Sequence, residues 1–150
     1  MSKFIYRMQN ILNIKYKLEE QAKTEFMLAN QKLQEEEKKL EQLQLRKLGY
    51  EEDARKMLTH NLQVDRIKEI QEAIVRMKEF IDLQMICVKD AQWEVEKKAA
   101  KLTEVMQERK AQEKLKEKSF ENFLQEENAK ESKEIDELVS FTYGKRRREE

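Results

Sequence analysis

The amino-acid sequence predicts an all-α protein: an antiparallel two-helix coiled-coil hairpin in which the C-terminal helix is longer than the N-terminal one. Three observations lead to this prediction. Apolar residues recur every seven positions along most of the chain, helix breakers are scarce (no Pro and two Gly), and the repeat weakens in one place near the middle. Abundant Lys, Glu, Gln and Leu make long helices the default conformation.

The clearest repeat runs from Ile67 to Val105. With Ile67 at position a of a heptad, the a and d positions are apolar except for Gln84 and Lys98, and the residues between them are mostly charged or amidated. A narrow apolar stripe of this kind belongs to a coiled-coil helix, because a helix on a globular core has a wider apolar face. We call the a and d residues of a helix its seam, and here they are Ile67, Ile70, Ile74, Met77, Ile81, Gln84, Val88, Ala91, Val95, Lys98, Leu102 and Val105.

A second helix is predicted before this one, from about residue 2 to 57. Its seam contains two consecutive steps of four residues, from Leu18 to Ala22 and from Ala22 to Phe26, which predicts a stutter that locally relaxes the supercoil. Ser2 is a plausible N-cap for this helix. The predicted seam is Phe4, Met8, Ile11, Lys15, Leu18, Ala22, Phe26, Ala29, Leu33, Glu36, Leu40 and Leu43.

A turn is predicted at about residues 58–65, within a single coiled-coil domain of residues 1–150. Gly49 weakens the helix before it, poor helix formers follow at residues 59–61, and Asn61 or Asp65 could cap the next helix. The second helix is then expected at about 66–143, with Gly144 as its stop and 144–150 as a basic tail.

A turn near residue 61 fixes the approximate register of the two arms. Residue i lies opposite about residue 122 − i, so Phe4 is expected to face Lys118 and Leu40 to face the neighbourhood of Asp82. Residues beyond about 120 then have no antiparallel partner, and their apolar stripe must be covered by another protein or a second copy. The alternative is a shifted register in which Phe4, Ile5 and Met8 cover it. This stripe consists of Leu124, Ile135, Leu138 and Phe141.

The composition excludes most chemical functions. Charged residues make up 41% of the chain in equal numbers of each sign, which argues against nucleic-acid binding by bulk electrostatics. One His and one Cys cannot form a four-ligand zinc site, no phosphate-binding glycine loop is present, and no apolar run could span a membrane. We therefore expect no catalytic residues, no metal and no cofactor. Cys87, at a g position, is expected to be a buried or half-buried thiol, and a lone cysteine fits a reducing compartment. The Lys145–Arg148 cluster could be a solubilising tail, a contact for anionic lipid or a nucleic-acid patch.

Two stretches at the ends of the chain resemble motifs of the FliJ family. Residues 3–12, KFIYRMQNIL, are similar to its opening K-F-x-Y-R-L-x-x-[IVL]-L, and residues 127–138, ENAKESKEIDEL, are similar to its closing E-x-x-x-x-E-x-K-x-[IL]-D-E. The chain length also fits, whereas the middle of the chain matches no fixed motif.

The resemblance implies a non-enzymatic component of the bacterial flagellar type III export apparatus, cytoplasmic and peripherally associated with the inner membrane at the flagellar base. It implies a central stalk that inserts its terminal ends into the hexameric export ATPase, stimulates it and couples it to the cytoplasmic domain of the export gate. Escort of export chaperones is also implied. The expected ring contacts are Phe4, Ile5, Leu124, Ile135, Leu138 and Phe141, and the expected gate contacts are Ala73, Met77, Phe80 and Gln84.

Three alternatives remain open at this stage. The chain could be a structural homodimer, a parallel rod whose register is set by Gln84 and Lys98. It could be an adaptor for export chaperones that uses the adaptable side chains of Met77, Met85 and Met106. It could also be the equivalent stalk of a virulence type III secretion system.

Overall fold

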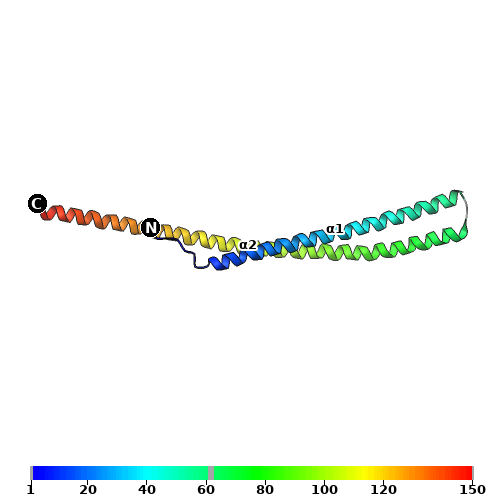
Figure 1. Cartoon of the computed structure of the whole chain (residues 1–150), viewed down its shortest axis with the longest axis horizontal. Helices are drawn as coiled ribbons and strands as arrows, with labels where there is room; N and C mark the ends of the chain where they lie inside the picture. The colour runs from blue at the N-terminus through cyan, green and yellow to red at the C-terminus, as the bar shows by residue number, and fades with distance from the viewer. Residues whose placement is uncertain (1, 61–62, 150) are drawn as a thin grey trace. The chain divides into compact units, whose positions relative to one another are not determined.

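The computed structural model describes residues 2–60 and 63–149 and confirms the predicted fold class. In this part of the chain, helices α1 (Gln9–His60) and α2 (Val64–Glu149) pack antiparallel, and α2 is the longer (Figure 1). The chain divides into two compact units. One comprises the N-terminal residues through Glu19 together with α2 from Val105 onwards, and the other comprises Glu20–Glu104.

The N-terminal residues depart from the prediction, because α1 begins at Gln9 rather than near residue 2. Residues 2–6 have no regular secondary structure, and the Gln9 amide donates to the Tyr6 carbonyl at 3.2 Å. Ser2 is therefore not an N-cap, and its hydroxyl donates instead to the Glu127 carboxylate. The non-helical path allows this segment to reach α2, where Phe4 packs.

Helix α1 ends at His60 and α2 begins at Val64, and both of these ends fall within the stretch 58–65 for which the turn was predicted. Asn61, one of the two proposed caps, lies outside the described residues. Asp65 lies in the first turn of α2, where a negative charge is favourable at the positive end of the helix dipole. At the other end, α2 does not stop at Gly144 but continues to Glu149. One internal Gly costs a helix about 1 kcal/mol, and the Arg residues in the last turn oppose that cost through the dipole.

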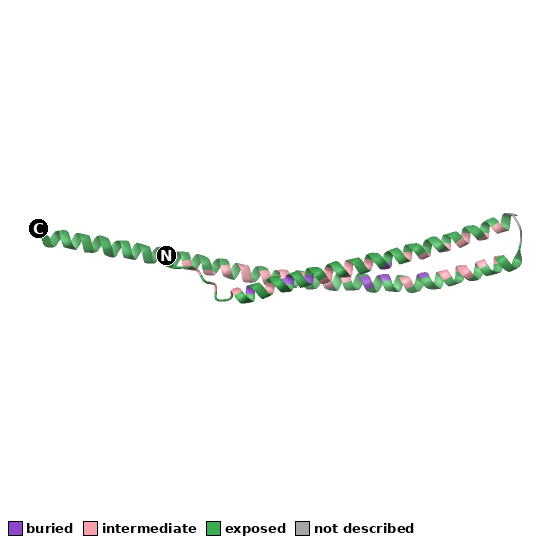
Figure 2. Ribbon diagram, in the orientation of Figure 1, coloured by how far each residue is buried: buried purple, intermediate pink, exposed green. Residues whose placement is uncertain are grey.

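The seam of α2 lies where the sequence predicts it. Every a and d residue between Ile67 and Val105 is buried or half-buried (Figure 2). The least exposed are Ile81, Val88, Ala91 and Val105, each at 8% or less. Gln84 and Lys98 occupy their expected places in the same row.

The seam of α1 differs from the prediction over its first turns. Met8, Ile11 and Leu18 remain about 40% exposed, whereas Leu12 and Glu19 are buried. The spacing of three and four continues without a break, so the predicted stutter is wrong. The sequence-based assignment followed apolar residues, but the helix turns the charged residue Glu19 inward in place of Leu18. The observed seam is Leu12, Lys15, Glu19, Ala22, Phe26, Ala29, Leu33, Glu36, Leu40, Leu43, Lys47, Tyr50, Ala54 and Met57.

Candidate partner-binding surfaces

An aromatic cluster joins the N-terminal segment to α2. The Phe4 ring meets Phe120 edge-on at a centroid distance of 5.1 Å and Phe123 at 5.4 Å. Phe4 therefore lies further along α2 than the predicted position opposite Lys118. The physical reason is the non-helical path before Gln9, because an extended chain advances about 3.3 Å per residue against 1.5 Å in a helix. Phe4 is half-buried by these contacts, while its neighbour Ile5 remains exposed.

Beyond this cluster, α2 continues without a helix beside it (Figure 1). Every residue from 128 to 149 is exposed (Figure 2). Among the predicted ring contacts, Leu124 is 43% exposed, and the exposed fractions of Ile135, Leu138 and Phe141 are 60%, 65% and 72%. The shifted register that would have covered this stripe with Phe4, Ile5 and Met8 does not occur among the described residues.

Two further exposed apolar side chains, Val139 and Tyr143, lie on the same part of α2 and were not included among the predicted contacts. Val139 follows Ile135 by four residues, so a search by helical spacing would have found it. Tyr143 carries the Arg147 guanidinium 6.0 Å from its ring centre, within cation–π range. The end of α2 therefore combines apolar side chains with a basic last turn.

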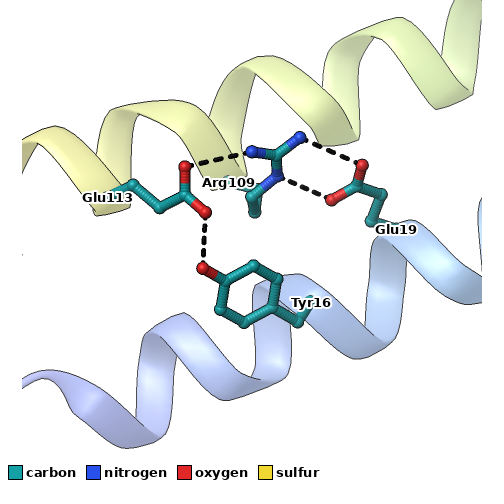
Figure 3. A network of polar contacts seen from close by, with 4 residues as sticks. All are labelled: Tyr16, Glu19, Arg109 and Glu113. Carbon is teal, nitrogen blue, oxygen red and sulfur yellow. Dashed lines mark hydrogen bonds and ion pairs between the residues drawn. The ribbon is translucent and has the colours of Figure 1, made fainter.

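A polar network spans the two helices just before the aromatic cluster (Figure 3). The Arg109 guanidinium forms a fork on Glu19, with Nε donating to Oε2 at 2.7 Å and Nη2 donating to Oε1 at 3.1 Å. Its third nitrogen donates to Glu113 at 3.0 Å, and the Tyr16 hydroxyl donates to the same carboxylate. A buried carboxylate at a seam position is tolerated because this planar fork satisfies both of its oxygens.

These contacts shift the pKa values of the network. The hydrogen bond from Tyr16, followed by that from Arg109, lowers the pKa of Glu113. The hydrogen bond to Glu113 raises the pKa of Tyr16, and the one to Glu19 raises the pKa of Arg109. Each shift favours the protonation state that the network needs at neutral pH. The arrangement is one of structural ion pairing between the two helices.

The four predicted gate contacts lie in the other unit, on adjacent turns of α2. Ala73 and Met77 are half-buried, and Phe80 is 50% exposed. The Gln84 amide is occupied within the hairpin, since its Nε2 donates to the Glu36 backbone carbonyl at 2.9 Å and to the Glu36 carboxylate. The four side chains follow each other at steps of four, three and four, so they share one face of the helix, with Phe80 as its most accessible member.

Glu36 is the buried acidic partner of Gln84. Lys32 lies 2.9 Å from the Glu36 carboxylate, and Lys39 lies 3.7 Å from it. The hydrogen bond from Lys32, followed by that from Gln84, lowers the pKa of Glu36. The charge of Glu36 is thus balanced from its own helix, and Gln84 serves the pairing of the arms.

A shallow groove of about 650 Å³ lies beside the seam where Ala29 and Ala91 stand. Small residues at two seam positions leave room that larger ones would fill. Cys87 lines this groove and is exposed, so the prediction of a buried or half-buried thiol is wrong. Cys87 is at a g position, which flanks the seam. The nearby side chains of Ala29 and Ala91 are too small to cover its thiol. The groove could have been predicted from the two alanines.

The described residues contain no group of three or more side chains placed to hold a metal ion. Within the same residues, neither helix contains a stretch apolar enough to cross a membrane.

Comparisons with known proteins were made against families, curated proteins and solved structures. A family model described as "Flagellar FliJ protein" matches residues 3–148. No curated protein matches the chain. A solved structure titled "Structure of a putative YscO homolog CT670 from Chlamydia trachomatis" is similar, with a TM-score of 0.57 and 21% sequence identity over 99% of this chain and 100% of that chain. At that identity, the likeness shows a shared fold.

Proposed function

The chain belongs to the FliJ family of flagellar proteins, and we propose that it is a non-enzymatic stalk of the flagellar protein export apparatus. In this role it inserts into the hexameric export ATPase, stimulates hydrolysis and couples the ring to the export gate. It would work in the cytoplasm, at the cytoplasmic face of the inner membrane at the flagellar base.

The observation that carries this proposal is the unpaired end of α2. Leu138 and its neighbours expose apolar side chains on a helix segment that no other described residue covers. Apolar surface left exposed in this way is typical of a site that binds another protein. The adjoining basic turn, Lys145–Arg148, would confine this contact to a partner surface with acidic groups.

A two-helix unit also has the diameter and the asymmetry that a stalk inside a sixfold ring requires. Two packed helices are about 20 Å across. Because α2 continues beyond the first residue of α1, the end of the hairpin presents different surfaces in different directions, and it has no sixfold symmetry. A contact that binds one subunit conformation better than another shifts the equilibrium between them. Such a stalk would stimulate hydrolysis without supplying a catalytic group.

The contact with the export gate is proposed for the face of α2 around Phe80. Phe80 offers a half-exposed aromatic ring, and aromatic residues are enriched in the buried core of protein interfaces. Met77 and Ala73 would extend the apolar contact, while Gln84 holds the two helices in register through Glu36.

A titration of the purified export ATPase with this chain tests the stalk role. Hydrolysis is expected to rise with added chain, and Leu138→Asp should weaken the stimulation. Leu48→Asp is the matched control, because Leu48 is 55% exposed on α1 and belongs to neither proposed surface. Unchanged turnover at saturating wild-type chain would contradict the proposal.

Escort of export chaperones is a second candidate. It is favoured by the exposed thioethers of Met27 and Met85, since flexible Met side chains adapt to several partners. Capture of purified export chaperones by the chain in the absence of the ATPase would support this role, and failure to capture them at micromolar concentrations would exclude it.

A further inference from the structure

A second heptad repeat begins in α2 after the hairpin repeat ends. Continued beyond Phe123, the hairpin repeat would place Glu126, Lys130, Lys133, Glu137 and Ser140 on the inward side, all of them polar. Ile135 and Leu138 lie instead on a row of a different phase, whose positions follow each other at steps of four, three and four. This second row, which we call the terminal row, consists of Glu131, Ile135, Leu138 and Thr142, with Val139 at its flank.

The terminal row lies on a different face of α2 from the hairpin seam, so α1 could not cover it even if α1 were longer. Its two apolar members, Ile135 and Leu138, are 60% and 65% exposed, and the flanking Val139 is 60% exposed. The Thr142 hydroxyl donates to the Leu138 carbonyl at 2.9 Å within the helix. A neighbouring helix can therefore cover Thr142 without leaving an unpaired hydroxyl. The row has the spacing of a short coiled-coil interface, and no helix of the described residues packs against it.

The charges on this segment indicate which helix would fit. Residues 131–137 contain four acidic groups and one basic group, whereas residues 142–148 contain four basic groups and no acidic one. A parallel pair of identical segments would bring like charges together. An antiparallel pair would lay the basic end of each copy along the acidic stretch of the other, which is the complementarity that selects coiled-coil partners.

The terminal row also fits itself in an antiparallel register. Placing Leu138 opposite Val139 of a second copy brings Ile135 opposite Thr142 and Glu131 opposite Arg146. Each of these contacts occurs twice, because a twofold axis repeats it. The Arg147 guanidinium stands over Tyr143 on another side of the helix and leaves this register free.

We propose that the terminal segment of α2, residues 128–149, pairs antiparallel with the same segment of a second copy of this chain. The overlap is about 30 Å long at 1.5 Å per residue, so the interface falls in the small, reversible class. This pairing does not depend on the proposed stalk role. If that role holds, a ring that needs the same segment must displace the second copy, and the pairing keeps the apolar row covered until then.

Sedimentation velocity of the full chain over a range of concentrations tests the pairing. The wild-type chain is expected to show reversible, concentration-dependent dimers that weaken as salt is raised. Leu138→Asp should remove the dimers, and Leu48→Asp should leave them. A wild-type chain that stays monomeric up to millimolar concentration would overturn the proposal, whatever its effect on the ATPase.

Charge reversal tests the antiparallel register. Glu131→Arg and Arg146→Glu should each weaken self-association about tenfold, because each replaces two attractive pairs with two repulsive ones. The double variant restores opposite charges in an antiparallel dimer and should recover wild-type association. An equimolar mixture of the two single variants should likewise form a mixed dimer. Circular dichroism must show unchanged helix content, and a double variant no better than the single ones would overturn the proposed register.

Discussion

The Arg109 guanidinium of α2 donates two hydrogen bonds to the Glu19 carboxylate of α1, from Nε at 2.7 Å and from Nη2 at 3.1 Å. Both residues occupy seam positions of their helices. Glu19 is 5% exposed, so its charge is largely removed from water, and the Arg109 fork compensates for the lost hydration. This part of the hairpin is thus held by matched polar groups, whereas Ile67–Leu102 of α2 is held largely by apolar contacts.

Removing one member of this pair is expected to cost more than removing both. Arg109→Ala removes both hydrogen bonds of the fork from the buried Glu19 carboxylate and should lower the thermal unfolding midpoint by roughly 5 °C or more. The double change Glu19→Leu with Arg109→Leu should restore or exceed the wild-type midpoint, because two leucines pack as an ordinary apolar layer. Thermal scans by circular dichroism measure both.

Lys97→Ala provides the control for that comparison. Lys97 pairs with Glu94 at 3.2 Å on the exposed surface of the same helix, where an ion pair contributes little. The thermal unfolding midpoint of Lys97→Ala should match that of the wild type. If the midpoint of Arg109→Ala equals that of Lys97→Ala, the Arg109 fork does not stabilise the hairpin.

Stability should fall on acidification. The lowered pKa values of Glu36 and Glu113 mean that these carboxyls bind a proton more readily in the unfolded chain than in the folded one. Their contribution is therefore present above an ordinary Glu pKa of about 4.3 and is lost as the pH falls through the lowered values. Urea midpoints between about pH 7 and pH 3 measure this, and the combined variant Glu36→Gln with Glu113→Gln should show a flatter profile. An equally steep profile would assign the acid sensitivity to other groups.

The N-terminal segment should be anchored by Phe4. Phe4→Ala removes the ring that meets Phe120 and Phe123 and should destabilise this unit by about 1–2 kcal/mol. Hydrogen exchange should accelerate in residues 9–19 and around Phe120. Ile5→Ala is the neighbouring control, since Ile5 is 78% exposed, and exchange rates identical in the two variants would contradict an anchoring role.

The gate contact proposed for α2 is tested by Phe80→Ala. Binding to the isolated cytoplasmic domain of the export gate should weaken roughly tenfold, as expected for an aromatic anchor, with little change in thermal stability. Val75→Ala is a matched control, because Val75 is 54% exposed on another side of the same helix. Equal affinities of the two variants for the gate domain, measured by titration calorimetry, would contradict a gate contact at Phe80.

Much of the fold could be predicted because a heptad is visible in one helix alone. The repeat from Ile67 to Val105 fixed the seam of α2, scarce helix breakers fixed the all-α class, and the two terminal motifs correctly indicated the family. The beginning of α1 could not be predicted in the same way. The buried carboxylate of Glu19 is satisfied by Arg109, and that partner lies far away in the sequence.

The candidate surfaces were predictable to different degrees. Exposure of Leu138 followed from the unequal arm lengths, and the two facing alanines could have indicated the groove beside Cys87. The position of Phe4 could not be obtained from helical register, because the chain before Gln9 is not helical. The binding roles of both surfaces remain predictions.

Site-specific cross-linking is the most direct test of the central claim that the end of α2 docks in the ATPase ring. In a Cys87→Ser background, a thiol-reactive photocross-linker is placed through Leu138→Cys, and through Leu48→Cys as the exposed control. With the assembled hexamer present, cross-links to ATPase subunits are predicted from position 138 and not from position 48. Cross-linking that is equal at the two positions, or confined to position 48, would contradict the account.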